Sequence, residues 1–222
     1  MNDILRFISS LQVKSLLEIS ALVLSVINGL WILWFYLRDR PKLVVDPIHP
    51  EIYQWWFELP PGECENRETR RFGFLLYASI ANKGLRKTSL RSWRLHVWSS
   101  NWRREKLKPM NMPQPVAKLG EHGKVYPTLG QAGVIGEDIF DGGTGVEAGG
   151  GVSGMILYIY ECYGDEVWNP RIREDDTIKV KLVVHEVFGS KTTEKFTLTK
   201  KPFEEIEEIL PGIVEMHESR EA

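Results

Sequence analysis

The chain has 222 residues, a formal net charge of −2, 43% hydrophobic residues and 26% charged residues. These values exclude a disordered chain and are typical of a folded protein. About 180 residues follow the N-terminal apolar segment, which is enough for one domain with its own core. The two cysteines, Cys64 and Cys162, permit one disulfide, but their spacing does not require it.

The N-terminal 38 residues have the pattern of a membrane-associated segment. Residues 1–15 carry apolar side chains at helical spacing, and we expect a short amphipathic segment there. Residues 16–38 form the predicted transmembrane helix, because no charged residue occurs from Ile19 to Leu37. A helix of that length rises about 28 Å, close to the thickness of the hydrocarbon core of a bilayer.

The C-terminal end of this segment has the residues that favour a membrane interface. Trp31, Trp34 and Tyr36 have amphipathic rings that suit the headgroup level, and Arg38 and Arg40 follow where they can reach phosphates.

Two other interpretations of the apolar segment are disfavoured. A core helix would carry a charged face, and a cleavable signal peptide would have a shorter apolar region followed by small residues.

Asn28 and Gly29 lie near the centre of the predicted span. We consider two roles for the Asn28 amide. It bonds to its counterpart in a homo-oligomer, with Gly29 allowing close approach, or it bonds to the backbone of its own helix.

The basic residues beside the span predict its orientation. Three lysines and arginines follow the span and two precede it, namely Arg38, Arg40 and Lys42 against Arg6 and Lys14. This small excess predicts a single-pass protein of the cell membrane with a cytoplasmic C-terminal domain.

Residues 42–201 have the pattern of a β-domain. Alternating apolar residues predict strands, with a hairpin turn around Gly189, at 42–45, 72–80, 90–98, 155–162, 178–185 and 195–199. Strands with turn residues and little helix predict an antiparallel β-sandwich. Residues 202–222 predict a short acidic helix, which ends at Pro211, and a tail.

Two further stretches of the domain have unusual compositions. The Gly- and Pro-rich insertion 108–151 lacks the Gly-Lys-Ser/Thr ending of a phosphate-binding loop, so we expect a long excursion between strands. The stretch "YQWWFELPPG" (53–62) places Trp55, Trp56 and Phe57 either in the membrane interface or in the core.

Three stretches after the apolar helix support a family resemblance: "SIANKG" (79–84), "GGGVSGMILYIY" (149–160) and "IKVKLVVHEVFGSK" (178–191). With these stretches in this order after an apolar helix, the chain resembles uncharacterised bacterial single-span, membrane-anchored proteins with an immunoglobulin-like β-sandwich domain. The resemblance implies a fold class and no catalytic residues.

Charge is distributed unevenly along the chain. Residues 67–108 contain twelve Lys or Arg and two Glu, a net charge of +10, so the rest of the chain sums to −12. Cations interleaved with tryptophans suit an anionic partner. The candidate residues are Arg86, Lys87, Arg91, Arg94, Trp98, Trp102, Arg103 and Arg104. Three interpretations stay open: internal pairing with the acidic segment 137–176, an anionic lipid surface, and a nucleotide or nucleic acid.

The sequence lacks the motifs of known catalytic and metal sites. No Cys-x-x-Cys, no paired zinc-ligand histidines and no Gly-x-Ser-x-Gly motif occurs, so we expect no enzyme activity, cofactor or metal. The enzymatic alternative is a hydrolase with an unrecognised site in the insertion 108–151. The sequence favours a membrane-anchored interaction module that contacts anionic lipid or a protein partner. The alternative is a ligand-gated membrane effector whose domain binds an anionic nucleotide and whose spans form a homo-oligomer.

Overall fold

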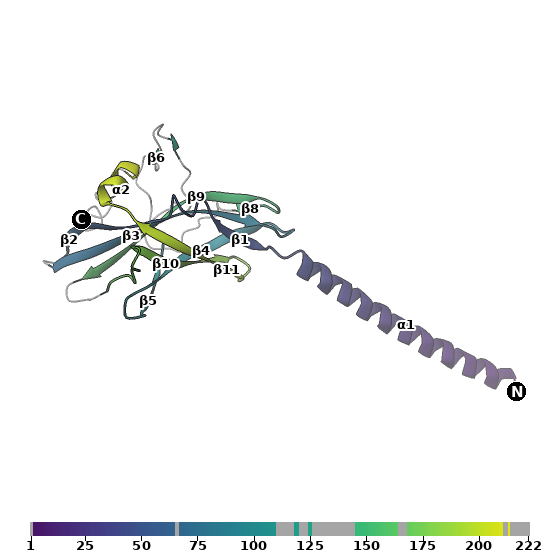
Figure 1. The fold of residues 1–222 in the computed structure, drawn as a ribbon. Coiled ribbons are helices and arrows are strands. Elements are labelled where there is room, and N and C mark those ends of the chain that lie inside the picture. The colour runs from purple at the N-terminus through teal and green to yellow at the C-terminus, as the bar shows by residue number, and fades with distance from the viewer. Residues whose placement is uncertain are drawn as a thin grey trace.

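The computed structural model describes residues 2–64, 67–109, 118–119, 124–125, 145–163, 168–210 and 213. It consists of a long N-terminal helix, a mostly-β domain and a short C-terminal helix (Figure 1). Helix α1 (Asn2–Arg38) is continuous through the predicted amphipathic segment and the predicted span. With 37 residues, it is about 55 Å long.

The C-terminal part of α1 projects away from the domain. Its segment Glu18–Arg38 has a mean hydropathy of 1.8, is long and apolar enough to cross a membrane, and has none of its residues buried. The prediction of an apolar helix of spanning length is confirmed. The alternative of a buried core helix is wrong, because this segment makes no part of the described core.

The main sheet has nine strands. They are β1 (Leu43–Pro47), β2 (Trp55–Cys64), β3 (Arg67–Asn82), β4 (Thr88–Trp98), β5 (Arg104–Leu107), β8 (Gly145–Val146), β9 (Gly151–Tyr163), β10 (Thr177–Glu186) and β11 (Lys191–Lys200). Strands β6 (Lys118–Leu119) and β7 (Lys124–Val125) form a separate hairpin, and α2 covers Phe203–Ile209.

The sheet order is β1-β3-β2-β11-β10-β4-β5, and β8 pairs with β4. Strands β1 and β2 pair with successive parts of β3, and β9 pairs with β3 along both of these parts. All of these pairs are antiparallel except β2 and β11, which pair in parallel at Trp55–Thr199 and Trp56–Lys200. The prediction of a mainly-β domain is confirmed, but the prediction of a purely antiparallel sheet is not, because the sheet is mixed. Local periodicity identifies strands and carries no information on which strand lies beside which.

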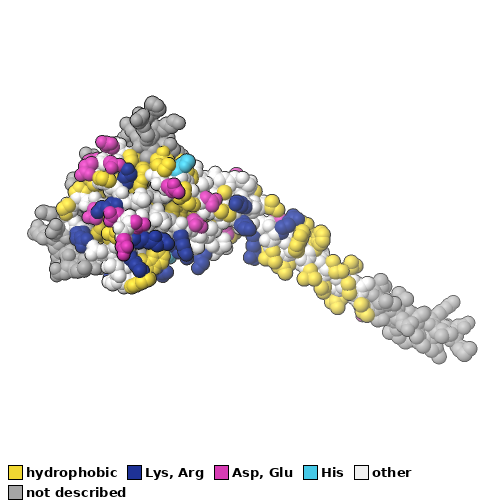
Figure 2. Space-filling view, viewed as in Figure 1, with side chains coloured by type: hydrophobic (Ala, Val, Ile, Leu, Met, Phe, Trp, Pro, Cys, Tyr) yellow, Lys and Arg dark blue, Asp and Glu magenta, His cyan; other side chains and the backbone are white. Residues whose placement is uncertain are grey.

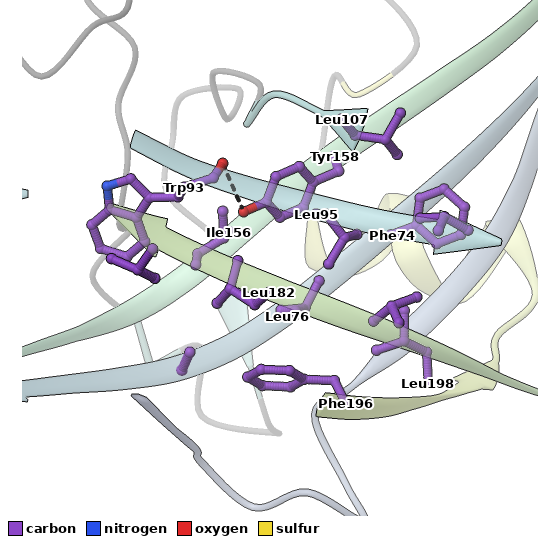
Figure 3. Packing of buried hydrophobic residues seen from close by; sticks show 14 of the residues in the cluster. Phe74, Leu76, Trp93, Leu95, Leu107, Ile156, Tyr158, Leu182, Phe196 and Leu198 are labelled. Carbon is purple, nitrogen blue, oxygen red and sulfur yellow. Dashed lines mark hydrogen bonds between the residues drawn. The ribbon is translucent and has the colours of Figure 1, made fainter. Parts of the chain in front are cut away.

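One core lies between two parts of this sheet. Side chains from β3 and β9 meet side chains from β4, β10 and β11, as Figure 3 shows. The Tyr158 hydroxyl of β9 donates to the Trp93 carbonyl of β4 at 3.4 Å across this core. Burial raises the pKa of Tyr158, so the hydroxyl stays protonated and remains a donor.

A second core lies on the other face of β2, β3 and β9. Leu75 and Tyr77 of β3 point to this face, whereas Phe74 and Leu76 point into the first core. The apolar side of α2, including Ile206, packs on it together with Ile213. The predicted short acidic helix is confirmed, and it covers a sheet face that would otherwise expose apolar side chains to water.

Trp55, Trp56 and Phe57 are buried. Trp56 points into the first core, while Trp55 and Phe57 point into the second, and none is more than 4% exposed. The alternative that these residues lie in the membrane interface is therefore wrong.

The buried Asn82 side chain connects α1 to the domain. Its Oδ1 accepts from the backbone amides of Lys42 at 3.1 Å and Gly84 at 3.0 Å. Its Nδ2 donates to the carbonyls of Arg86 at 2.7 Å and Val146 at 3.3 Å. One amide thus joins the linker after α1, the β3–β4 loop and β8.

Gly84 lets the linker and the β3–β4 loop approach closely. A Cβ atom at this position would lie 2.3 Å from the Arg40 carbonyl oxygen and 2.6 Å from the Lys42 nitrogen. Both are backbone atoms, so a larger residue would push the linker away. Together with the Asn82 contacts, this fixes where α1 leaves the domain.

We expect Asn82→Ala to lower the free energy of unfolding by about 2–4 kcal/mol, since it removes the partner of two amides and two carbonyls. Asn82→Asp keeps the acceptor oxygen but puts a second carboxylate oxygen against the Arg86 and Val146 carbonyls in a buried site, so it should be at least as destabilising as Asn82→Ala. Urea unfolding of the full chain in detergent, followed by tryptophan fluorescence, measures both values. Equal stability of wild type and Asn82→Ala would contradict this role.

Candidate functional site

Four basic side chains form a row across the outer face of β5, β4, β10 and β11. His96 lies opposite Lys106 on one side and Lys181 on the other, and Lys181 lies opposite Lys195. Residues directly opposite in antiparallel strands point to the same face, with Cβ atoms about 4.5–5.5 Å apart. We call Lys106, His96, Lys181 and Lys195 the basic row.

The alternation of β4 places these side chains outside. Trp93, Leu95 and Val97 are buried in the first core, whereas Arg94, His96 and Trp98 are only partly buried on the opposite face. This division of β4 is as the sequence predicts.

Further cations surround the basic row. On β4, Arg94 lies two residues before His96 and the exposed Arg91 lies further along; on β5, Arg104 lies opposite Trp98. We call the basic row with Arg91, Arg94, Trp98 and Arg104 the basic face. Figure 2 shows Lys and Arg side chains gathered over β10 and β4.

Burial and the positive charges of this face lower the pKa of His96. Its pKa is lowered from 6.5 to about 4, first by burial and then by the positive charges of Arg104, Lys106, Lys181 and Arg94. His96 is therefore neutral at pH 7. Protonating it would add another cation to a site that already holds four.

These cations are not neutralised by acids of the described chain. Within the described residues, none of Arg94, Arg104, Lys106 and Lys181 has a carboxylate within ion-pair distance, although other basic residues do. Such an arrangement can hold the phosphate or carboxylate groups of a ligand by charge-assisted hydrogen bonds.

The structure divides the predicted anion-binding residues among three places. Arg91, Arg94, Trp98 and Arg104 belong to the basic face. Arg86 and Lys87 lie in the β3–β4 loop near α1, where Lys87 pairs with Glu147 at 2.5 Å between Nζ and Oε1. Arg103 and Trp102 lie in the β4–β5 turn, and Arg103 pairs with Glu105 at 2.8 Å.

Trp102 is the most exposed aromatic of the described domain. It is 69% exposed, has φ of 64°, and the Arg171 guanidinium stacks 3.7 Å from its ring centroid. The turn is held by bonds such as Trp102 N–H to the Ser99 carbonyl at 3.0 Å and Arg171 N–H to the Trp98 carbonyl at 2.8 Å. The ring is therefore fixed in an exposed position.

Sequence reasoning missed His96, Lys181, Lys195 and Arg171 as members of a site. The alternation of lysines in β10 and β11 shows that they face outward, but only the strand order places them beside β4. The interpretation that the basic segment pairs with the acidic segment 137–176 holds for Lys87 and Glu147. Residues 137–144 and 164–167 of the acidic segment, with five of its ten Asp and Glu, lie outside the described residues.

The residues predicted for a membrane interface lie at the end of α1. Trp31, Trp34 and Tyr36 are more than half exposed. The Arg38 guanidinium lies 4.9 Å from the Trp34 ring, and that of Arg40 lies 5.0 Å from the Tyr36 ring. These contacts place aromatic rings and charges at one level of the helix, and their role at a membrane interface stays a prediction.

Asn28 and Gly29 are exposed on the same helix, and a Cβ at Gly29 would meet no atom within 4 Å. The surface at this position is therefore open. Whether the Asn28 amide bonds across an oligomer or to its own helix stays a prediction.

Among the described residues, no group of three His, Cys, Asp or Glu side chains is arranged to hold a metal ion. The depression lined by Arg171–Asp175 is open to solvent. The buried Cys162 thiol donates to the Trp168 carbonyl at 3.6 Å, whereas the side chain of Cys64 lies outside the described part.

Comparison with known proteins identifies no relative. No protein-family model and no curated protein matches the chain. A Northeast Structural Genomics Consortium target covers 73% of this chain and 89% of its own, with 10% identity and a TM-score of 0.29. A Bordetella pertussis protein described as ApaA covers 73% and 96%, with 11% identity and a TM-score of 0.29. At these values neither likeness supports an argument about fold or function.

We expect Lys181→Gln to raise the pKa of His96 from about 4 toward 6.5, without reaching it, because burial is the larger cause. Lys191 lies opposite His185 rather than His96, so Lys191→Gln is the matched control and should leave the pKa of His96 unchanged. NMR titration of the His96 ring measures both. An unchanged His96 pKa in Lys181→Gln would show that the row does not act on His96.

The same shift predicts a pH dependence of stability. The folded pKa lies below the ordinary 6.5, so the unfolded chain binds this proton first as the pH falls. The free energy of unfolding should therefore decrease as the pH falls from 6.5 to 4. The decrease should be smaller in His96→Gln, which lacks this titrating group.

Proposed function

We propose that this chain is a membrane-anchored, non-enzymatic interaction module whose basic face binds an anionic partner, first of all the anionic lipids of its own membrane. The observation that carries the proposal is the group of unneutralised cations around His96, in a domain that follows an apolar helix of spanning length. The tether keeps this face close to one bilayer surface, so weak contacts suffice.

The proposed compartment is the cytoplasmic side of the cell membrane. The excess of Arg38, Arg40 and Lys42 after the span supports this orientation. The cytoplasmic leaflet carries anionic lipids, and each Lys or Arg near such a surface contributes about 1 kcal/mol.

For the domain we propose an immunoglobulin-like sandwich. The first core, which lies between two parts of the sheet, supports it, while the parallel pairing of β2 and β11 departs from the purely antiparallel pattern.

The test uses the full chain in nanodiscs. Thr197 is exposed on β11 beside the basic row, so a donor dye is attached at Thr197→Cys. Cys64→Ser removes the other labelling target. Energy transfer from the dye to an acceptor lipid reports how close this face lies to the bilayer. We expect more transfer with phosphatidylglycerol present than with phosphatidylcholine alone, and loss of the difference at high salt.

A triple variant and its control test which cations are responsible. Arg94→Gln/Lys106→Gln/Lys181→Gln should remove the lipid dependence. Arg70→Gln/Lys200→Gln/Lys201→Gln, whose cations contact Asn169, Glu58 and Glu205, changes the net charge equally and should keep it. Equal transfer in both membranes for the wild type would contradict the proposal.

The second candidate is a ligand-gated effector whose domain binds an anionic nucleotide. The exposed Trp102 ring, with Arg171 on one side and Arg104 nearby in sequence, favours it, since bases stack on such rings. Calorimetry with cyclic and linear nucleotides should then show binding that Trp102→Ala abolishes and Ile172→Ala, an exposed control, retains. Absence of heat with every nucleotide would exclude this candidate.

A further inference from the structure

Three exposed apolar side chains gather at the end of the domain where α1 leaves it. Leu85 in the β3–β4 loop is 62% exposed, and Val187 and Phe188 in the β10–β11 hairpin are 50% and 61% exposed. We call these three residues the apolar tip. Hairpin turns normally carry polar residues or glycine, so two large apolar residues here require an explanation.

Hydrogen bonds hold the two loops of the tip beside each other. The Val187 amide donates to the Ser89 carbonyl at 3.1 Å, at the start of β4. The buried Glu186 carboxylate accepts from the Thr88 hydroxyl at 3.0 Å and from the Ser190 hydroxyl. The hairpin is thus fixed to the strand that follows the Leu85 loop.

The same loops are bonded to the linker that follows α1. The Lys83 amide donates to the Lys42 carbonyl at 2.8 Å, and the Thr192 hydroxyl donates to the Leu43 carbonyl at 3.1 Å. Leu37, the last residue of the apolar run, precedes Lys42 by five residues, which span at most about 18 Å. The apolar tip therefore lies near the level at which α1 would leave a membrane (Figure 1).

Charge around the tip is complementary to a lipid surface. The cations there are Arg40, Lys42, Lys83, Arg86, Lys87 and Lys191, and all are exposed. Three described carboxylates of these segments are engaged: Glu147 pairs with Lys87, Asp39 pairs with Arg38, and Glu186 is buried. Figure 2 shows basic side chains beside the exit of α1.

We infer that the apolar tip inserts into the headgroup region of the bilayer that α1 crosses, with the surrounding cations on lipid phosphates. The tip and α1 then form two attachments to one bilayer, which limit how far the domain can swing on its linker. Apolar groups between cations match the apolar and anionic layers of that interface. The inference rests on the proposed membrane anchoring.

The experiment uses the full chain in nanodiscs that contain phosphatidylglycerol. A polarity-sensitive dye at Lys191→Cys leaves Leu85, Val187 and Phe188 intact, and Cys64→Ser removes a second target. The matched control is the same dye at Glu174→Cys, an exposed position in the loop before β10, at the opposite end of that strand. Lipids with a quencher near the headgroup report depth.

We expect a blue-shifted emission and quenching by these lipids at position 191, and neither at position 174. Adding Val187→Ser and Phe188→Ser to the Lys191→Cys chain should shift the emission back to that of the control. Circular dichroism checks that this variant keeps its fold, since both side chains are exposed.

Three outcomes would overturn the inference. In the first, the chain co-purifies with nanodiscs, but aqueous iodide quenches the dye at position 191 as strongly as the dye at position 174. This result leaves the anchoring intact and refutes the insertion. A concentration-dependent blue shift without lipid quenching shows that a second copy covers the tip. Chain that fails to co-purify with nanodiscs refutes the membrane anchoring itself.

Discussion

The Asn82 side chain is the contact on which the arrangement of this molecule depends. Four hydrogen bonds from one buried amide join the linker, the β3–β4 loop and β8, and the Asn82 backbone adds two more with Gly149 and Gly150. A linker between a helix and a domain is ordinarily free to bend. Here its backbone is bonded to the sheet, and Gly84 allows it to lie directly on the loop. The position at which α1 leaves the sheet is thus fixed, and under the proposed anchoring it determines which end of the sheet lies nearest to the membrane.

The basic face has an electrostatic cost that the fold alone does not explain. Lys181 and Lys195 lie directly opposite each other, and like charges in that position are destabilising by a few tenths of a kcal/mol or more. His96 avoids adding to the repulsion by remaining neutral. A surface that serves only solubility would mix both signs of charge, whereas this face concentrates one. The cost is offset if an anion is bound there.

Alternation of apolar residues predicts most of the long strands. Phe72 to Ile80, Trp93 to Val97, Ile178 to Val184 and Phe196 to Leu198 lie as expected. Strand β2 escapes prediction because Pro60 and Pro61 interrupt it at an irregular register and because α2 makes both of its faces buried. Two buried faces remove the polar alternation that identifies a strand in a sequence.

The site is predicted less completely than the fold, for a physical reason. Arg91, Arg94 and Arg104 are close in sequence and indicate a basic region. Lys181 and Lys195 join them only because β10 lies between β4 and β11, and this order follows from long-range packing. The apolar tip combines loops about 100 residues apart, and the parallel pair β2–β11 is likewise set by packing rather than by local pattern.

The side of the membrane on which the domain lies tests the account most directly, because anionic lipid is abundant on the cytoplasmic leaflet. The measurement is labelling of Glu174→Cys, in chain with Cys64→Ser, by a membrane-impermeant maleimide in cells that express it. A cytoplasmic domain should give no labelling of intact cells and full labelling after permeabilisation. Labelling of intact cells would contradict this location.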